Sequence, residues 1–589
     1  MPDVDITIEI CGMSGDGTIS AGGLLNAAMS HAGFSVMAFD SYPAEIRGFG
    51  RCVTRSRIGT QEMLALDDQT HVLISLDDEQ SISRIPYLSD NAVIFFDNRP
   101  SSNIAENRSI TAHIEPDANL LGVPFVDLAS EASGTTRGRN LTALGAFAAI
   151  AGLMPQTFRD VIEFKFMAKG EAVLNSNLKC FDAGYNYAKK EFKDRVIPSL
   201  SFSQETLNQG RVLYSGNTAI SKGAMDAGLK LYFGYPITPA TPIMEYLAKA
   251  LPEKGGRILQ MEDEISSIGA VLGSFYAGKR AMTATSGPGF ALMTELISYG
   301  VMAEIPAVIV NAQRGGPSTG LPTKTEQSDL HAAVFGGPGD SPRIVIAPSN
   351  VSECYEYTVK SFQIAEKYQT PVIVLTDFFL DNRVENIVEP KANKQEVADG
   401  NIYPDNSVKG EYKRFELTES GISPRSIPGS EGLIYTATGL EHTEKGMPDY
   451  TADNHMEMSS KRHRKVMNSL KDLFPPEEFL TDATMDVGII AWGSSFGSVL
   501  EAVQKTKDKG LKTGALKISS LFPYHAEEIR QFMDRCKEVL IPELNFEGQL
   551  ANLIGHLHRK EVKRFNRATG TPLSVSEIVK KIEKICDNL

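Results

Sequence analysis

The chain has 589 residues, a formal net charge of −14 and 42% hydrophobic residues. This length predicts two to four domains, and the excess of acids argues against a large surface for nucleic acid or anionic membrane. The six cysteines are scattered, without a C-x-x-C pair. We therefore expect neither an iron–sulfur cluster nor a structural metal in this chain.

The N-terminal residues MPDVDITIEI carry acids where a secretory signal needs bases, and the longest apolar runs are too short to span a bilayer. So few thiols over this length also fit a reducing compartment. The sequence predicts a cytoplasmic chain outside the membrane.

Residues 1–195 read as a first α/β domain. The run ITIEIC, the glycine loop GMSGDG, a helix-length segment and SVMAFD are typical of a βαβ unit. The apolar runs HVLISLDD and NAVIFFDN predict two further buried strands. A polar connector, SLSFSQETLNQG, follows this domain.

The loop GMSGDG has three interpretations. A dinucleotide fingerprint, with Asp40 as the ribose acid, requires G-x-G-x-x-G, whereas Gly12, Gly15 and Gly17 give the order G-x-x-G-x-G. The GDG of a thiamine diphosphate motif lacks the Asn expected about thirty residues later. Contact with a nucleotide or coenzyme A phosphate and a tight strand-to-helix turn both remain open.

A second α/β domain is predicted over residues 206–385. Six apolar runs alternate with helix-length segments, which predicts a parallel sheet with helices on both faces. These runs are LKLYFG, GRILQ, KRAMTATS, IPAVIV, PRIVIAP and TPVIVLTD. Polar and glycine-rich residues follow each run, at the sheet edge where such folds bind ligands.

Residues 386–484 lose this alternation and are expected to form a long connection with a short helix around KRHRKVMNSLKDLF. The charge run from Lys461 to Lys465 is expected to be a solvated helix face, with a patch for a partner as the alternative. Residues 485–589 form a third α/β unit with the predicted strands VGIIAWG, LKTGALKIS and EVLIPELN.

Three acids, Glu262, Asp263 and Glu264, stand where the run GRILQ gives way to a helix. Acids in the first turn of a helix interact favourably with the helix dipole, so helix capping can explain all three. Glu264, however, is in register with Ile268 and Leu272 on the apolar side. A carboxyl group there can keep a proton and donate it to a ring nitrogen, as cofactor activation requires.

The turn SGPG, at residues 286–289, has free backbone N–H groups at a helix start. Such a turn can receive an anion or let a ring approach the backbone, and it can equally be structural.

Four motifs occur in one order: GYPITPATP, MEDEISSIGAVLGS, TATSGPGF and NAQRGGPSTGLPTKTEQSDL. They resemble the alpha subunit of 2-oxoacid:ferredoxin oxidoreductases. GMSGDGTISAGG and SYPAEIRGFG are similar to the gamma domain of that family, and AWGSSFGSVLEA and PELNFEGQL to its later part. The fused arrangement most resembles the large subunit of the 2-oxoglutarate enzymes.

The resemblance implies three α/β domains: a gamma-type domain, a pyrimidine-binding thiamine-enzyme domain, and one like the C-terminal domain of transketolase. It implies that Glu264 meets N1′ of the thiamine aminopyrimidine and that Thr238 approaches the substrate carboxylate. It also implies that Arg314 lies near the carboxylate or carbonyl of the substrate. Glu262 and Asp263 keep their capping interpretation. The resemblance puts a short loop on the cofactor side, namely Tyr235, Pro236, Ile237 and Thr238.

The partners follow from the same resemblance. Thiamine diphosphate sits at the interface with a smaller beta subunit, which supplies Mg²⁺ and a [4Fe–4S] cluster, in an (αβ)₂ assembly that exchanges electrons with ferredoxin. Coenzyme A is a cosubstrate beside the gamma domain. Its candidate phosphate contacts are Gly15, Asp16, Gly17, Arg47, Arg51, Arg55 and Arg57. Strand-edge charges are an equal interpretation for each arginine.

The expected reaction is oxidative decarboxylation of 2-oxoglutarate to succinyl-CoA and CO₂, or the reverse carboxylation. The distal carboxylate of 2-oxoglutarate needs a binding site with a cationic side chain or several hydroxyl groups. Candidates for this site are Ser318, Thr323 and Lys324. Three alternatives remain: a branched-chain or broad 2-oxoacid enzyme, a non-catalytic subunit of such a complex, and a nicotinamide-dependent dehydrogenase, which the glycine order disfavours.

Overall fold

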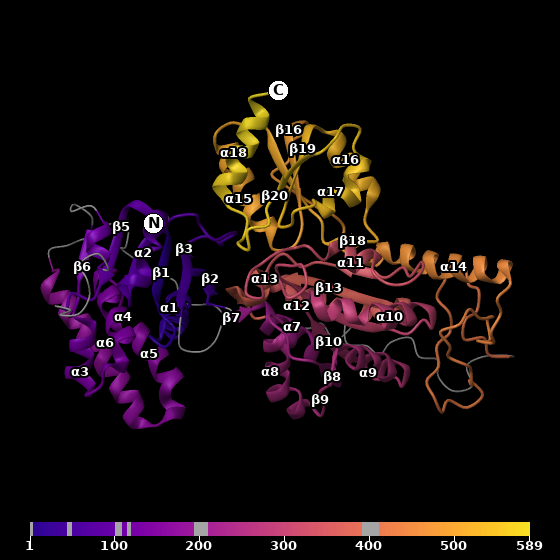
Figure 1. Cartoon of the computed structure of the whole chain (residues 1–589), viewed down its shortest axis with the longest axis horizontal. Helices are drawn as coiled ribbons and strands as arrows, with labels where there is room; N and C mark the ends of the chain where they lie inside the picture. Colours follow the sequence, from indigo (N-terminus) through magenta and orange to yellow (C-terminus); the bar gives the residue numbers. More distant parts are fainter. Residues whose placement is uncertain (1–3, 44–49, 100–108, 115–118, 194–209, 392–410) are drawn as a thin grey trace. The chain divides into compact units, whose positions relative to one another are not determined.

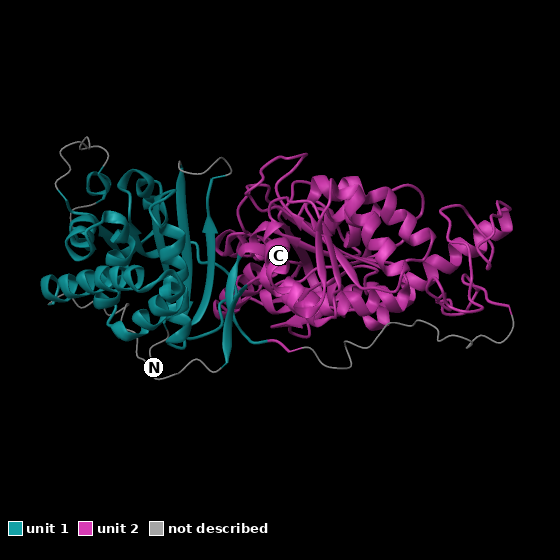
Figure 2. Cartoon of the chain, turned by 90° about the horizontal axis from the view of Figure 1, so that it is seen from below, with its two compact units in different colours: residues 1–214, 383–389 teal, residues 215–382, 390–589 magenta. Residues whose placement is uncertain are grey.

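The computed structural model describes residues 4–43, 50–99, 109–114, 119–193, 210–391 and 411–589 (Figure 1). The chain divides into two compact units (Figure 2). Unit 1 comprises residues 1–214 and 383–389, and unit 2 comprises residues 215–382 and 390–589. Three main sheets carry this α/β fold, one of them in unit 1. Among the described helices, none is both long and apolar enough to cross a membrane.

The sheet of unit 1 has the order β6-β5-β4-β1-β3-β2-β14-β7. Its strands are β1 (Asp5–Met13), β2 (Ser35–Ser41), β3 (Arg51–Gly59), β4 (Thr70–Ser75), β5 (Leu88–Phe96), β6 (Asn119–Gly122), β7 (Arg211–Ser215) and β14 (Val384–Val388). The predicted strand-helix-strand unit is present, but β3 lies between β1 and β2 and is antiparallel to both. The sequence prediction did not include β3 among the strands.

Six helices accompany this sheet: α1 (Thr18–His31), α2 (Asp78–Ile82), α3 (Phe125–Ser133), α4 (Arg139–Ile150), α5 (Pro155–Phe166) and α6 (Glu171–Glu191). Helices α4 and α6 approach closely because glycine stands at the contact. A Cβ atom at Gly145 would lie 2.1 Å from the carbonyl oxygen of Phe181, and one at Gly184 would lie 2.0 Å from that of Thr142. A larger residue at either site would push the two helices apart.

Strand β14 joins unit 1 from far along the chain. Asn386 accepts a hydrogen bond from the backbone N–H of Val36 (2.9 Å) and donates one to the carbonyl of Phe34 (2.6 Å). Arg211, in β7, donates to the carbonyl of Asn386 at 3.0 Å. Residues 211–214 and 383–389, which the sequence placed in the second domain and at the start of the connection, thus complete the first sheet.

All six predicted strands of the second sheet are present, and they are parallel to one another. The order is β18-β12-β13-β11-β10-β8-β9. The strands are β8 (Leu231–Gly234), β9 (Arg257–Gln260), β10 (Ala281–Thr285), β11 (Ala307–Gln313), β12 (Ile344–Ile346), β13 (Pro371–Asp377) and the antiparallel edge strand β18 (Ser520–Phe522). Strands β10, β11 and β13 are fully buried, as expected of strands covered on both faces.

The helices around this sheet are α7 (Gly216–Asp226), α8 (Thr241–Ala250), α9 (Glu264–Tyr276), α10 (Gly287–Met302), α11 (Leu330–Phe335), α12 (Val351–Tyr368) and α13 (Phe378–Asn382). Helices α8, α9, α10, α11 and α12 each follow a strand. Their first turns therefore lie at the carboxyl edge of the sheet, the edge that the sequence assigned to ligands.

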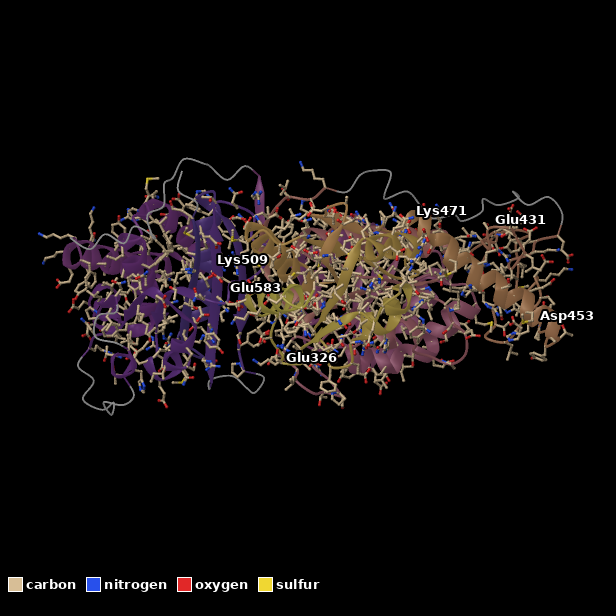
Figure 3. All side chains as sticks on the ribbon, turned by 90° about the horizontal axis from the view of Figure 1, so that it is seen from above. Glu326, Glu431, Asp453, Lys471, Lys509 and Glu583 are labelled. Atoms are coloured by element: carbon tan, nitrogen blue, oxygen red, sulfur yellow. The ribbon has the colours of Figure 1, made fainter. Side chains whose placement is uncertain are left out.

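The third sheet has the order β15-β17-β16-β19-β20. Its strands are β15 (Glu477–Phe479), β16 (Met485–Ala491), β17 (Thr513–Lys517), β19 (Cys536–Glu543) and β20 (Lys563–Asn566), and its helices are α15 (Ser495–Asp508), α16 (Ala526–Asp534), α17 (Gln549–Ile554) and α18 (Val575–Cys586). The three predicted strands are confirmed as β16, β17 and β19. A salt bridge of 2.7 Å between Lys509 and Glu583 joins α15 to α18 (Figure 3).

The charge run in α14 (Ala452–Met467) is not the solvated face that the sequence indicated. Lys461 and Lys465 are 0% and 2% exposed, and each binds the carboxylate of Glu304 at 2.6 Å. Arg414 donates to the backbone carbonyl of Glu304 at 2.7 Å. The prediction was wrong because one carboxylate, distant in sequence, supplies the counter-charge that lets the lysines be buried.

Candidate active site

The predicted site residues of unit 2 follow neighbouring strands at one edge of the second sheet. The segment 235–238 follows β8, Glu264 opens the helix after β9, the turn 286–289 follows β10, and Arg314 follows β11. In the sheet these strands are arranged as β11-β10-β8-β9. The fold therefore gathers four sequence-distant segments at the edge where parallel sheets bind ligands.

The three acids at the start of α9 have different environments. Asp263 is the N-cap: its carboxylate accepts the backbone N–H of Ser266 at 2.8 Å, and its own N–H donates to the hydroxyl of Ser266. These hydrogen bonds lower the pKa of Asp263. Glu262 is exposed. The capping interpretation is confirmed for Asp263, and Glu264 is the acid that turns inward.

Glu264 is 7% exposed, in line with the buried Ile268 and Leu272. Its carboxyl group lies against Gly289, the last residue of the SGPG turn. A Cβ atom at Gly289 would lie 2.4 Å from Glu264 Oε1 and 2.2 Å from Thr285 Oγ1. Glycine is required here because a methyl group would occupy the space in front of the carboxyl group.

Arg314 and Thr238 are in contact. Nη1 of Arg314 donates to the carbonyl oxygen of Thr238 at 2.8 Å. Burial lowers the pKa of Arg314, and its Nε has no hydrogen-bond partner among the described residues. Tyr235 and Pro236 are exposed and Ile237 is half-buried, so this loop stays open to a ligand or partner.

Asp329, near the end of the motif NAQRGGPSTGLPTKTEQSDL, is a further acid at this edge for which the sequence predicted no role. Its carboxylate accepts a hydrogen bond from the amide of Asn311 (3.3 Å). A Cβ atom at Gly287 would lie 2.8 Å from Asp329 Oδ2. Each of the two glycines of the SGPG turn therefore lies against a carboxyl group: Gly287 against that of Asp329 and Gly289 against that of Glu264.

Residues after strand β19 of the third sheet form hydrogen bonds with the segment that carries Asp329. Gln549 donates through its amide to the carbonyl of Ser328 at 2.7 Å and accepts the N–H of His331 at 3.1 Å. The N–H of Gln327 donates to the carbonyl of Leu544 at 2.7 Å. The motif PELNFEGQL thus fixes the backbone on both sides of Asp329.

The candidate receivers of a distal carboxylate lie on the loop between β11 and α11. Ser318 and Lys324 are exposed, and Thr323 is half-buried. The side chain of Lys324 passes close to Gly570, where a Cβ atom would lie 2.8 Å from that of Lys324. The loop leaves their polar groups accessible.

In unit 1 the loop GMSGDG is largely engaged with its own unit. The carboxylate of Asp16 accepts the N–H of Met13 at 2.8 Å and forms an ion pair with Arg139. Gly15 and Gly17 have φ values of 105° and 81°, and Gly17 is the N-cap of α1. These features favour the tight-turn interpretation, since left-handed backbone suits glycine.

The arginines proposed for coenzyme A differ in their surroundings. Arg55 pairs with the buried Glu9 at 3.3 Å, and Arg57 binds Asp5 at 2.6 Å. Both are strand charges with internal partners. Arg51 is exposed and donates to the hydroxyl of Ser83. Arg47 lies outside the described residues.

Three family models match the chain. Residues 222–461 match the pyruvate flavodoxin/ferredoxin oxidoreductase model for the thiamine-diphosphate-binding region, residues 7–187 match the pyruvate ferredoxin/flavodoxin oxidoreductase model, and residues 485–578 match core domain II of pyruvate:ferredoxin oxidoreductase. The alpha subunit of 2-oxoacid:ferredoxin oxidoreductase 2 from Aeropyrum pernix is 30% identical, with 99% of this chain and 98% of that protein covered.

The chain belongs to the 2-oxoacid:ferredoxin oxidoreductase family. Another relative in this family is the 2-oxoglutarate oxidoreductase subunit KorA of Mycobacterium tuberculosis, which is 31% identical, with 98% of this chain and 90% of that protein covered. The predicted family resemblance is confirmed.

A solved structure extends the similarity over the whole length. The 2-oxoglutarate:ferredoxin oxidoreductase from Magnetococcus marinus, with 2-oxoglutarate, coenzyme A and succinyl-CoA bound, is 36% identical and has a TM-score of 0.92. The match covers 99% of this chain and 100% of that one. The α/β fold class predicted from the sequence is that of a 2-oxoacid:ferredoxin oxidoreductase.

Proposed function

We propose that this chain is the alpha subunit of a thiamine-diphosphate-dependent 2-oxoglutarate:ferredoxin oxidoreductase. It catalyses the coenzyme A-dependent conversion of 2-oxoglutarate to succinyl-CoA and CO₂, or the reverse carboxylation, with ferredoxin as the electron partner. The observation that carries the proposal is the buried carboxyl group of Glu264 beside Gly289, at the same sheet edge as the Arg314–Thr238 pair.

The residues at the SGPG turn fit the aminopyrimidine of thiamine diphosphate. Glu264 is buried, Gly289 leaves the space before its carboxyl group free, and the buried hydroxyl of Ser286 has no hydrogen-bond partner among the described residues. Glu264 would hold a proton at the ring nitrogen N1′. The cofactor supplies the carbanion chemistry at its own reactive carbon.

The remaining residues orient the substrate. Arg314 and Thr238 receive the carboxylate or carbonyl next to the reacting carbon, because a guanidinium group binds a carboxylate through two parallel hydrogen bonds. The loop residues Ser318, Thr323 and Lys324 receive the distal carboxylate of 2-oxoglutarate. Tyr235, Pro236 and Ile237 line the cofactor side of the same edge.

A smaller beta subunit completes the site, with thiamine diphosphate at the interface and with Mg²⁺, the [4Fe–4S] cluster and an (αβ)₂ assembly as further expectations. Large apolar side chains remain exposed in the elements that carry the site: Tyr235, Leu259, Ile265 and Leu292. Their exposure supports a covering partner, since apolar surface in one region marks an interaction site.

The domain roles belong to the same proposal. Residues 1–195 form the gamma-type domain on the coenzyme A side, with Gly15, Asp16, Gly17 and Arg47 near its phosphates. Residues 206–385 form the pyrimidine-binding domain, 386–484 an extended connection, and 485–589 a domain like the C-terminal domain of transketolase.

The test is 2-oxoacid-dependent reduction of methyl viologen or ferredoxin by the chain co-expressed with its beta partner. Coenzyme A is present, and 2-oxoglutarate, pyruvate and 2-oxoisovalerate are compared. The proposal expects preference for 2-oxoglutarate, and at least about a 100-fold loss of turnover in Glu264→Gln, which cannot supply the proton. Glu262→Gln is the matched control, because it neutralises an exposed acid two positions earlier and should keep full activity.

Each other outcome corrects a definite part of the proposal. Preference for 2-oxoisovalerate would make the enzyme a branched-chain one. Full activity in Glu264→Gln would make Glu264 a structural residue of the first turn of α9. Absence of reduction with every 2-oxoacid by a folded complex would make the chain a non-catalytic subunit.

A further inference from the structure

Asp329 lies against Gly287 of the SGPG turn, whereas Glu264 lies against Gly289. It comes from the segment before α11, whereas its contacts come from other strands and turns. Asn311, in β11, donates to Asp329 Oδ2, and Gly287 leaves room for the same oxygen. The N–H of Asp329 donates to the side-chain oxygen of Gln313 at 3.0 Å. The carboxyl group is therefore held in place rather than free to turn away.

Unpartnered polar atoms occur on residues beside this carboxyl group, namely Asn311, which donates to it, and Ser286, which precedes Gly287. The side-chain oxygen of Asn311 and the hydroxyl of Ser286, both on residues with 0% exposure, have no hydrogen-bond partner in the described part of the chain. The same is true of Nε of Arg314, a residue that is 7% exposed. Buried polar atoms are costly without partners. Three of them at one edge indicate that a polar ligand completes this region.

Two charged side chains, Arg314 and Glu326, change the pKa of Asp329. Arg314, after β11, favours the ionised form of Asp329, while Glu326, from the same segment as Asp329, opposes it. Glu264 is the acid against the other glycine of the turn, Gly289. His331, in α11, is bonded to Gln549 through its ring and its backbone.

Burial outweighs the neighbouring cation and raises the pKa of Asp329 to about 6. The residue nevertheless keeps part of its surface open. A carboxyl group that is accessible and titrates near neutrality is typical of a functional position.

We propose that the protonation state of Asp329 controls how tightly a 2-oxoacid binds. The carboxylate of the 2-oxoacid binds at Arg314 when Asp329 is neutral, and ionisation of Asp329 weakens that binding. The inference rests on the proposed function, because it takes Arg314 as the receiver of the substrate carboxylate. A second anion near a guanidinium group that already holds a carboxylate would repel the substrate, whereas a neutral carboxyl group can donate a hydrogen bond to it.

The test is the pH dependence of substrate binding in the complex with the beta subunit. KM for 2-oxoglutarate and the competitive inhibition constant of 2-hydroxyglutarate are measured from pH 6 to pH 8, with coenzyme A saturating. Both ligands stay dianionic in this range, so the slope reports on the protein. The variants are Asp329→Asn, which mimics the protonated form, and Glu295→Gln, which removes one exposed charge from α10.

In the wild type and in Glu295→Gln, both constants are expected to rise at least tenfold between pH 6 and pH 8. In Asp329→Asn they should change less than about twofold and stay near the wild-type values at pH 6. A wild-type slope retained in Asp329→Asn would overturn the proposal. A large loss of binding in Asp329→Asn at pH 6 would overturn it as well, since the ionised carboxylate would then be required.

A second variant keeps the proposal testable if Asp329→Asn does not fold. Glu326→Gln removes the acid that raises the pKa of Asp329, so the rise in KM should begin at lower pH. An unshifted profile in this variant would count against Asp329 as the titrating group.

A readout without turnover checks the titration itself. The folded pKa of about 6 lies above the unfolded value of about 3.9, so the stability that Asp329 contributes is complete below pH 4 and is lost as the pH rises through 6. The melting temperature of Asp329→Asn, relative to that of the wild-type chain, should therefore increase from pH 4 to pH 7. A constant difference would contradict a raised pKa.

The two failures are distinguishable. If the wild-type complex turns over no 2-oxoacid, the proposed function fails and this inference fails with it. If the wild type is active with 2-oxoglutarate and only the slopes disagree, the role of Asp329 alone is wrong.

Discussion

Glu304 and Glu264 are both buried glutamates of unit 2, yet the fold treats them oppositely. Glu304 is 1% exposed and its carboxylate binds two lysines that are also buried. Burial alone would raise the pKa of Glu304, but the cations of Lys461, Lys465 and Arg414 hold it well below its usual range. The carboxyl group of Glu264 instead lies against Gly289 of the SGPG turn. The carboxylate of Glu304 is paired within the chain, whereas the carboxyl group of Glu264 faces the space that Gly289 leaves open.

The largest effect that tests this contrast is on stability. Glu304→Gln leaves two ammonium groups buried without a counter-charge, which should lower the free energy of unfolding by about 3–5 kcal/mol. Urea denaturation of the purified chain measures it. Glu444→Gln is the control, because Glu444 and its partner Lys413 are 28% and 40% exposed and their solvated pair should contribute little to stability. A loss equal to that of the control would mean that the lysines find other partners.

The next effect is on turnover. Gly289→Ala places a methyl group where only 2.4 Å separates it from Glu264 Oε1, so the carboxyl group must move. We expect about a 100-fold lower kcat, because small displacements of reacting groups are costly, with the fold retained. Steady-state viologen reduction measures kcat, and circular dichroism shows whether the fold is retained.

Gly273→Ala, in α9, is the matched control for this substitution. A Cβ atom at Gly273 meets no heavy atom within 4 Å, so alanine should keep the turnover and stabilise the helix by up to about 1 kcal/mol. Equal losses in the two variants would show that the space in front of Glu264 has no special role.

The smallest effect concerns the open side of the site. Ile265 is 46% exposed directly after the buried Glu264. Ile265→Glu should weaken association with the beta subunit by about tenfold, or roughly 1.4 kcal/mol, since a charge replaces apolar contact. Analytical ultracentrifugation of the purified subunits measures this. Unchanged affinity would place the beta subunit elsewhere.

Part of this arrangement could be predicted from sequence because its signals are local. The six apolar runs predicted the parallel strands, and the four-residue spacing of Glu264, Ile268 and Leu272 predicted an inward-facing acid. A continuous apolar run and a 3.6-residue period are both defined by neighbouring residues alone.

The rest depended on contacts between distant segments. Lys461 read as a surface charge because its counter-charge, Glu304, is 157 residues away. No sequence pattern marked Asp329 as a candidate. Its contacts with Asn311 and Gly287 exist only after β10 and β11 have placed these residues beside it. Strand β3 was missed because its arginines, Arg55 and Arg57, bind acids that the sequence does not place beside them.

The return of β14 to the sheet of unit 1 has a consequence for synthesis. Strand β7 lies next to β14 at the end of that sheet, so neither β7 nor the edge of β2 has its final neighbour until residues 384–388 have been made. At roughly 5–20 residues per second, the ribosome takes on the order of ten seconds or more to cover the intervening segment. During that interval the nascent chain exposes an unpaired strand edge, the kind of surface on which chains associate wrongly.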